Sequence, residues 1–138
     1  MGRAYPYCIT ERKFKTTLGK IWLGLHDMVW LGNTIEKVAK VDMGGDFFRN
    51  HRDGYKAIHV LRRSNQHGLY FEVSEFHNGS RKGVISIPAV LAQQGWVQFS
   101  CMCKDYWNMQ NPTKLPTREL TNDRHRVLGN LLFSIKPY

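Results

Sequence analysis

Three strand-like segments in succession, over residues 56–88, constrain the fold of this chain more than any other part of it. In each segment an apolar side chain recurs at every second position, the signature of a strand with one buried face. Hairpin turn signals stand ahead of the first segment, at Asp53-Gly54, and before the third, at Asn78-Gly79. The pattern predicts an antiparallel meander with one dry and one wetter face. The apolar positions are Ile58, Val60, Leu69, Phe71, Val73, Ile85 and Ile87.

A helix is predicted directly after this meander. Pro88 suits the first turn of a helix. From Ala89 to Tyr106, apolar residues then recur about one turn apart. We expect the helix to cover the dry face of the meander, with Trp96 and Phe99 in the core.

The N-terminal third of the chain shows the same order of strands and then a helix. Two strands are predicted on either side of a turn at residues 19–20. Asn33, followed three residues later by Glu36, resembles a capping box for a short amphipathic helix, which residues 44–45 would end. Residues 46–56 are read as a loop or a short strand.

The predicted class is α+β, with antiparallel sheets and helices packed on one face. Residues 1–110 are interpreted as one domain of two strand-then-helix repeats, about 8–45 and 47–107. Residues 111–138 are interpreted as a C-terminal arm, because their first half is polar and contains prolines. Their apolar end fits a last strand or a short helix equally well.

Charge and composition narrow the class of partner. The formal net charge is +9 on 138 residues, which favours a polyanion: nucleic acid first and an anionic membrane second. A solvated basic surface is the simpler alternative. No apolar run approaches 18 residues, so no transmembrane helix is expected, and a membrane is not among the expected partners. Three cysteines and the lack of a secretory signal favour an intracellular location, with nucleus or organelle left open.

A family resemblance rests on punctuating residues within and after the meander. These residues are Arg63-Ser64-Asn65, Gly68, Leu69 to Glu75, Arg81-Lys82, Ile87-Pro88 and Gly95-Trp96. With them the segment resembles plant-type single-stranded nucleic-acid-binding domains of the Pur and Whirly type. The resemblance covers about 40 to 50 residues and implies two strand-rich repeats that each end in a helix, pairing into a homodimer, and binding of single-stranded DNA or RNA.

Candidate binding residues are those that can hold phosphates or stack bases. His59, Arg63 and Tyr70 are expected on the wetter face of the meander. Tyr70 is equally compatible with packing against the C-terminal arm, and Arg62-Arg63 with a solvated strand end. Trp22 either faces solvent and stacks a base or is buried. The remaining candidates, in turns and in the N-terminal segment, are Arg49, Arg52, Lys56, Arg62, Arg81, Lys82, Lys13 and Lys15.

Catalysis and metal binding are not expected. Cys101 and Cys103 have no second pair at zinc-site spacing, and no acidic pair comes with a nucleophile or a base. We therefore expect a non-enzymatic protein without a cofactor. The alternative function is a protein-interaction or assembly module whose basic surface is incidental, since its aromatic residues and apolar C-terminal end also suit a protein partner.

Overall fold

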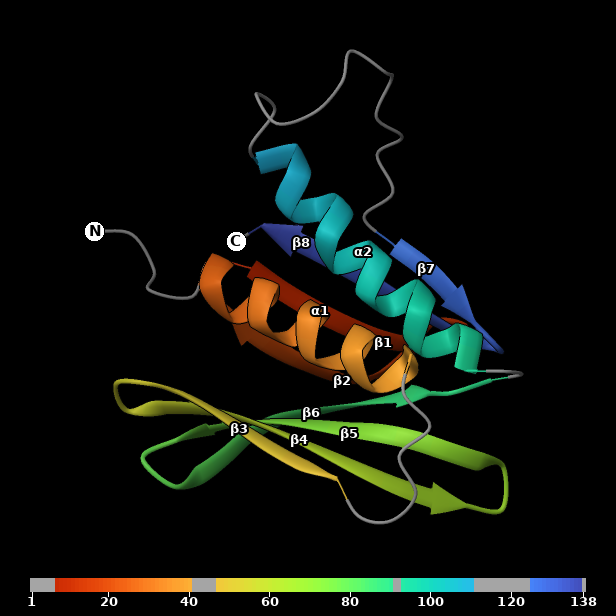
Figure 1. Ribbon diagram of the computed structural model, residues 1–138, viewed down its shortest axis with the longest axis horizontal. Helices are drawn as coiled ribbons and strands as arrows, with labels where there is room; N and C mark the ends of the chain where they lie inside the picture. The colour runs from red at the N-terminus through yellow and green to blue at the C-terminus, as the bar shows by residue number, and fades with distance from the viewer. Residues whose placement is uncertain (1–6, 41–46, 91–92, 111–124, 138) are drawn as a thin grey trace.

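The computed structural model describes residues 7–40, 47–90, 93–110 and 125–137 (Figure 1). The strands form two four-stranded antiparallel sheets, sheet A in the order β2-β1-β8-β7 and sheet B in the order β3-β4-β5-β6. The predicted α+β class is confirmed. In chain order the elements are β1 (Tyr7–Lys13), β2 (Thr16–Leu23), α1 (Leu25–Lys40), β3 (Phe48–Asp53), β4 (Lys56–Asn65), β5 (Gly68–His77), β6 (Ser80–Pro88), α2 (Gln94–Gln110), β7 (His125–Leu128) and β8 (Leu131–Pro137).

Sheet B contains the meander that the alternating pattern predicts. Strands β4, β5 and β6 pair in sequence, and β3 adds to β4 through the turn at Gly54. The predicted turn at Asn78-Gly79 is present, with φ of +50° and +84° at the two residues. The inward-facing apolar side chains of the meander are fully or almost fully buried, except for Leu69, which is 43% exposed at the start of β5.

The C-terminal residues are part of sheet A, which corrects the expectation of a separate arm over 111–138. Strand β8 pairs with β1 along its length, from Arg12↔Leu132 to Tyr7↔Pro137, and β7 pairs with β8. The apolar end of the chain is thus strand and not helix. Residues 111–124, and the helix end predicted at residues 44–45, lie outside the described residues.

The structure contains two equivalent units of four strands and a helix. One is β3-β4-β5-β6-α2, and the other is β7-β8-β1-β2-α1, whose strands come from both ends of the chain. The pairs Glu11↔Gly19 and Glu75↔Gly83 stand 64 residues apart in equivalent registers, and each is followed at the same position by a bulge. The repeat boundaries predicted at 8–45 and 47–107 are therefore corrected for the first repeat, which needs β7 and β8.

The two sheets meet where β2 crosses β6. A Cβ atom on Gly19 would lie 2.0 Å from the carbonyl oxygen of Val84, and one on Gly83 would lie 2.1 Å from the carbonyl oxygen of Lys20. No other residue fits at either point, since glycine alone lets two backbones approach so closely. Gly19 therefore lies within β2 at this crossing, and the turn predicted at residues 19–20 is wrong.

Two buried carboxylates tie the sheets together at the crossing. Glu11 Oε1 accepts a hydrogen bond of 2.9 Å from the backbone N–H of Ser86, and Glu75 Oε1 accepts one of 2.9 Å from that of Trp22. The ammonium of Lys56 donates to the carbonyl oxygen of Trp22. These side chains thus satisfy backbone N–H and C=O groups of the edge strands β2 and β6 that would otherwise be buried without partners.

The ends of the two helices differ from the prediction. Helix α1 begins at Leu25, because the N–H of Gly24 donates to Asp27 Oδ2 at 2.9 Å and so supplies the N-terminal cap that was expected at Asn33. Helix α2 begins at Gln94, five residues later than predicted. Its first turn lies close to the end of β6, since a Cβ on Gly95 would lie 2.1 Å from the carbonyl oxygen of Pro88.

Both helices lie together on one side of the sheets (Figure 1). Helix α2 contacts both sheets: the ring centroids of Trp96 and Phe71 in sheet B are 4.3 Å apart, and those of Phe99 and Phe133 in sheet A are 5.7 Å apart. As predicted, Trp96 and Phe99 are fully buried. One core therefore holds the two units together and leaves the far faces of both sheets in solvent.

Candidate nucleic-acid interface

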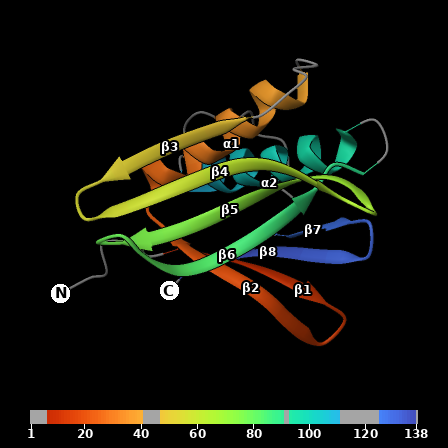
Figure 2. The same cartoon turned by 90° about the horizontal axis from the view of Figure 1, so that it is seen from below.

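The face of sheet B that points away from the helices, here called the outer face, collects aromatic and basic side chains. Figure 2 shows the strands of sheet B in front of the two helices. Because side chains alternate along a strand and paired residues share a face, the registers place alternate residues of each strand on the outer face. These are Phe48, Asn50 and Arg52 of β3, His59, Leu61 and Arg63 of β4, Tyr70, Glu72, Ser74 and Phe76 of β5, and Arg81, Val84, Ser86 and Pro88 of β6.

Three rings form a row across β3, β4 and β5 on the outer face. The centroids of Phe48 and His59 are 5.2 Å apart with the rings at 88°, and those of His59 and Phe76 are 4.5 Å apart at 37°. Phe48 is 47% exposed. Burial, with a smaller contribution from Arg52, lowers the pKa of His59, so its ring is neutral at neutral pH. The row presents flat faces and edges on which bases can stack.

Cations stand on both sides of this aromatic row. Arg52 is exposed on β3. On the other side, Arg63 Nε lies 2.9 Å from Glu72 Oε1, and Arg81 Nη2 lies 3.3 Å from Glu72 Oε2. Arg81 also donates to Ser74 Oγ at 2.9 Å. One carboxylate thus orients two guanidinium groups and leaves a positive charge between them, an arrangement that suits phosphate oxygens.

Five of the predicted residues fall on the outer face: Arg52, His59, Arg63, Tyr70 and Arg81. Tyr70 is half-buried and pairs with Pro88 on β6. Lys82 is the extra residue of the β6 bulge, and its side chain is exposed at the edge of this face.

Three other predicted residues of sheet B point toward the helix side. Lys56 is 0% exposed and lies 3.3 Å from Asp27 Oδ2. Its placement in the binding set is wrong, because its ammonium is bound within the protein. Arg49 is exposed but stacks over Phe47, 4.6 Å from the ring centroid, and Arg62 is half-buried on the same side as Arg49.

The N-terminal candidates belong to sheet A. Lys13 and Lys15 are exposed at the turn between β1 and β2. Trp22 is half-buried, on the side of β2 opposite Ile21 and Leu23, and its backbone is bound to Glu75 and Lys56. The structure therefore does not bring these three residues to the outer face of sheet B.

Sequence reasoning missed Phe48 and Phe76, the two phenylalanines of the aromatic row. Both carry a signal in the alternation: Phe76 has the same parity as Tyr70, and Phe48 has the same parity as Arg52. The sequence predicts only a loop or a short strand over residues 46–56, and it therefore assigns no face to Phe48. The extra residue of the bulge beside Phe76 is Lys82 on β6, so the alternation along β5 is unbroken and already places Phe76 on the face of Tyr70.

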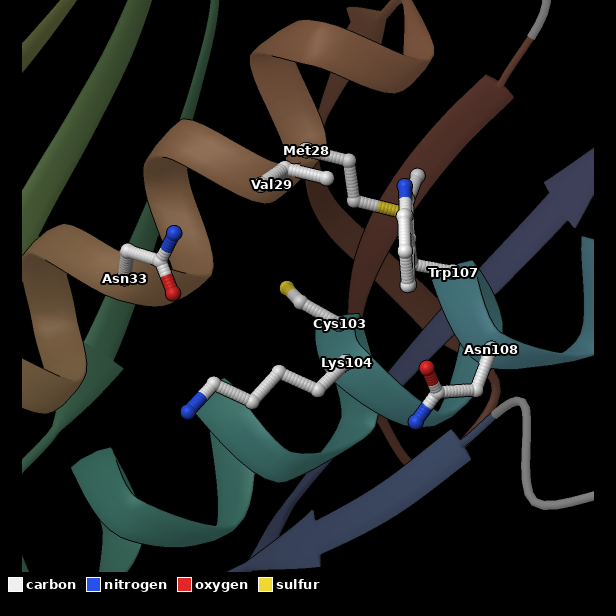
Figure 3. Close-up of a pocket in the computed structure, with 7 residues that line it drawn as sticks. All are labelled: Met28, Val29, Asn33, Cys103, Lys104, Trp107 and Asn108. Carbon is white, nitrogen blue, oxygen red and sulfur yellow. The ribbon is translucent and has the colours of Figure 1, made fainter. Parts of the chain in front are cut away.

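A concave feature lies between the two helices, on the other side of sheet B from the outer face (Figure 3). It is a cavity of about 240 Å³ whose walls are mostly apolar. Burial raises the pKa of Cys103 to about 12, so this thiol is not a nucleophile at neutral pH. The lining residues are Met28, Val29, Asn33, Cys103, Lys104, Trp107 and Asn108.

Over the part of the chain that the structure describes, no three His, Cys, Asp or Glu side chains lie where they could hold a metal ion. Cys8, Cys101 and Cys103 are free thiols. Neither α1 nor α2 is long and apolar enough to cross a membrane. Comparison of the sequence with models of known protein families and with curated proteins finds no match.

Proposed function

We propose that this protein binds single-stranded DNA or RNA across the outer face of sheet B. The observation that carries the proposal is the aromatic row of Phe48, His59 and Phe76 with arginines on both sides. Stacking on aromatic rings contributes about 1–3 kcal/mol per base and is tolerant of sequence. The net charge of +9 supplies long-range attraction to any polyanion.

The mechanism has two parts. Arg52, Arg63 and Arg81 neutralise phosphates, which releases counterions and makes the affinity fall steeply with salt. Unpaired bases then stack on the aromatic row. A duplex keeps its bases stacked on one another and cannot use that row, so single strands bind more tightly. The resemblance of the meander to Pur and Whirly-type domains agrees with this proposal.

Two arginines of β3 provide a matched test. Arg52 lies on the outer face and Arg49 on the opposite face; both are exposed and both carry one charge. We expect Arg52→Ala to lower the affinity for single strands and to make the slope of log affinity against log salt concentration shallower by about one. Phe48→Ala should lower the affinity for single strands about tenfold. Arg49→Ala should leave both nearly unchanged.

The measurement is fluorescence anisotropy with labelled single-stranded DNA, single-stranded RNA and duplex DNA over a salt series. Equal losses for Arg49→Ala and Arg52→Ala would mean that net charge alone drives binding, and would remove the outer face from the proposal. Equal affinity for duplex and single strand would contradict the stacking step.

Assembly through a sheet edge is the second candidate. Strand β7 is an edge strand of sheet A and carries Val127, which is 67% exposed. An exposed apolar edge can pair with a second copy of the chain. Sedimentation equilibrium of the wild type and of Val127→Lys tests this candidate, which predicts a dimer that the lysine weakens.

A further inference from the structure

The turn between β1 and β2 presents an aromatic ring to solvent from a strained backbone. Phe14 is 86% exposed and is the most exposed large apolar side chain among the described residues. Its φ is +56°. A bulky residue rarely adopts a positive φ, because its Cβ crowds the neighbouring carbonyl oxygen. Strain that a protein keeps at an exposed turn points to a functional constraint.

The internal repeat shows what this turn needs for folding alone. The equivalent turn between β5 and β6, 64 residues further on, has Asn78 in the place of Phe14, with a φ of +50°. Asparagine tolerates this conformation far better than phenylalanine does. The hairpin therefore does not require phenylalanine, and its presence at the tip is unexplained by the fold.

The neighbours of Phe14 are cations. Lys13 and Lys15 are exposed on either side of it. Arg12 Nη2 donates to the carbonyl oxygen of Lys15 at 3.3 Å and braces the turn. From Arg12 to Lys20 the sequence contains four cations and no acidic residue, so the ring stands in a positive field. An exposed ring between cations is the combination that binds a base together with its phosphates.

We propose that Phe14 is a second stacking contact, which takes one unpaired base of the nucleic-acid strand that crosses the outer face of sheet B. Lys13 and Lys15 hold the adjoining phosphates. This inference rests on the proposed function and adds a second contact to it. The outer face and Phe14 would hold the same nucleic-acid strand. Once one of them has bound it, the other contact forms within the complex and not from free solution, so the overall affinity is higher than that of either contact alone.

The position of the hairpin suits this arrangement. Figure 2 shows the β1–β2 hairpin projecting beyond β6, on the side away from β3. Between it and the outer face lies the crossing of β2 and β6, where Lys20 and Gly83 meet. Lys20 and Lys82 are both exposed there. A strand that leaves the aromatic row thus meets positive charge on its way to Phe14.

A lipid surface would also attract a basic hairpin, but this hairpin favours nucleic acid. Its exposed apolar side chains are Phe14 and, further along β2, Leu18 at 51%. That is little apolar area for membrane anchoring, since even a single acyl chain binds only marginally. One planar ring between two lysines is instead matched to one base between two phosphates.

The test uses the full chain, three substitutions at residue 14 and two lengths of oligothymidine. A strand of about 6 nucleotides covers the outer face alone, and one of about 24 nucleotides also reaches the hairpin. Phe14→Asn should lower the affinity for the longer strand about tenfold and leave that for the shorter one unchanged. Phe14→Trp should retain the affinity for the longer strand, and Phe14→Leu should behave like Phe14→Asn.

Thermal unfolding gives an independent readout. Phe14→Asn introduces the residue that the second repeat uses, so its melting temperature should rise by about 2–4 °C while binding falls. Phe14→Asn with wild-type affinity for the longer strand would overturn the proposal.

Vesicle binding separates the alternative. In this experiment the wild type and both variants are mixed with vesicles of anionic phospholipid. If Phe14→Leu still binds the vesicles and Phe14→Asn does not, the ring serves a lipid surface, and the proposal is overturned. If wild type binds neither oligonucleotide, the proposed function itself fails; if it binds both and only the Phe14 effects are missing, this inference alone fails.

Discussion

Glu11 shows how one buried carboxylate at the sheet crossing makes the stability depend on pH. Its side chain is 6% exposed. Burial raises its pKa above the ordinary 4.5, although the hydrogen bond from the N–H of Ser86 acts in the opposite direction. The folded protein therefore binds this proton more tightly than the unfolded chain does. The contribution of protonated Glu11 to the free energy of unfolding is fully present below pH 4.5. It is lost as the pH rises through the higher pKa that the group has in the folded protein.

Glu11→Gln removes this titration and retains an oxygen that can accept from Ser86. We expect the free energy of unfolding of the variant, minus that of wild type, to increase between acid and neutral pH by an amount on the order of 1 kcal/mol. Urea unfolding at a series of pH values measures the difference. A difference that is constant with pH, or that shrinks toward neutral pH, would show that Glu11 does not titrate with a raised pKa.

Single residues also show which parts of the site a sequence can predict. Alternation places His59 and Arg63 on one face, and the structure agrees. The same alternation places Lys56 with Ile58 and Val60 on the buried face, but a lysine beside a turn is normally exposed. Burial of Lys56 requires Asp27, 29 residues earlier, and such a distant partner is not visible in local sequence.

Among the elements, β2 and β6 depend most on the two glycines at the crossing. Gly83→Ala would place a Cβ 2.1 Å from the carbonyl oxygen of Lys20, and neither backbone can move without disturbing its sheet. We expect a loss of at least about 3 kcal/mol in the free energy of unfolding. Gly19→Ala should have a similar effect, because it meets the carbonyl oxygen of Val84 in the same way.

Gly129→Asn is the matched control for these substitutions. Gly129 has a φ of +63° in the turn between β7 and β8, and no atom lies within 4 Å of a Cβ built there. Asparagine tolerates that φ, so the control should lose well under about 1 kcal/mol. Urea unfolding compares the three variants. Wild-type stability in Gly83→Ala would mean that the strands do not approach as described.

At this scale the sequence predicts strands better than their ends. The meander follows from alternation and from turn residues whose preferences are local. The sequence predicts a turn at Gly19, because glycine serves both turns and close backbone approach and only the partner strand distinguishes the two uses. The sequence places the start of helix α1 at Asn33, since the cap that Asp27 provides for Gly24 is a weaker local signal.

At the scale of the whole molecule, the division of the first repeat between the two ends of the chain is the feature that sequence conceals. Equivalent positions have different residues, such as Arg12 and Phe76 beside the bulges, and few are identical. Strands β7 and β8 also precede β1 in the repeat but follow α2 in the chain. A repeat in that order leaves no run of similar sequence at a fixed period, so only the pairing of β8 with β1 reveals it.

This topology predicts that a circular permutant will fold. Tyr7 and Pro137 are paired neighbours on β1 and β8, so an Asn-Gly loop can join them as a hairpin. The new chain begins at His125 and ends at Gln110, and each repeat becomes continuous. We expect cooperative thermal unfolding and a circular dichroism spectrum like that of wild type.

Truncation to residues 1–110 should instead unfold the protein, because it removes the fully buried Phe133 and Ile135. A truncated chain as stable as wild type, or a permutant without cooperative unfolding, would contradict the view that β7 and β8 belong to the first repeat.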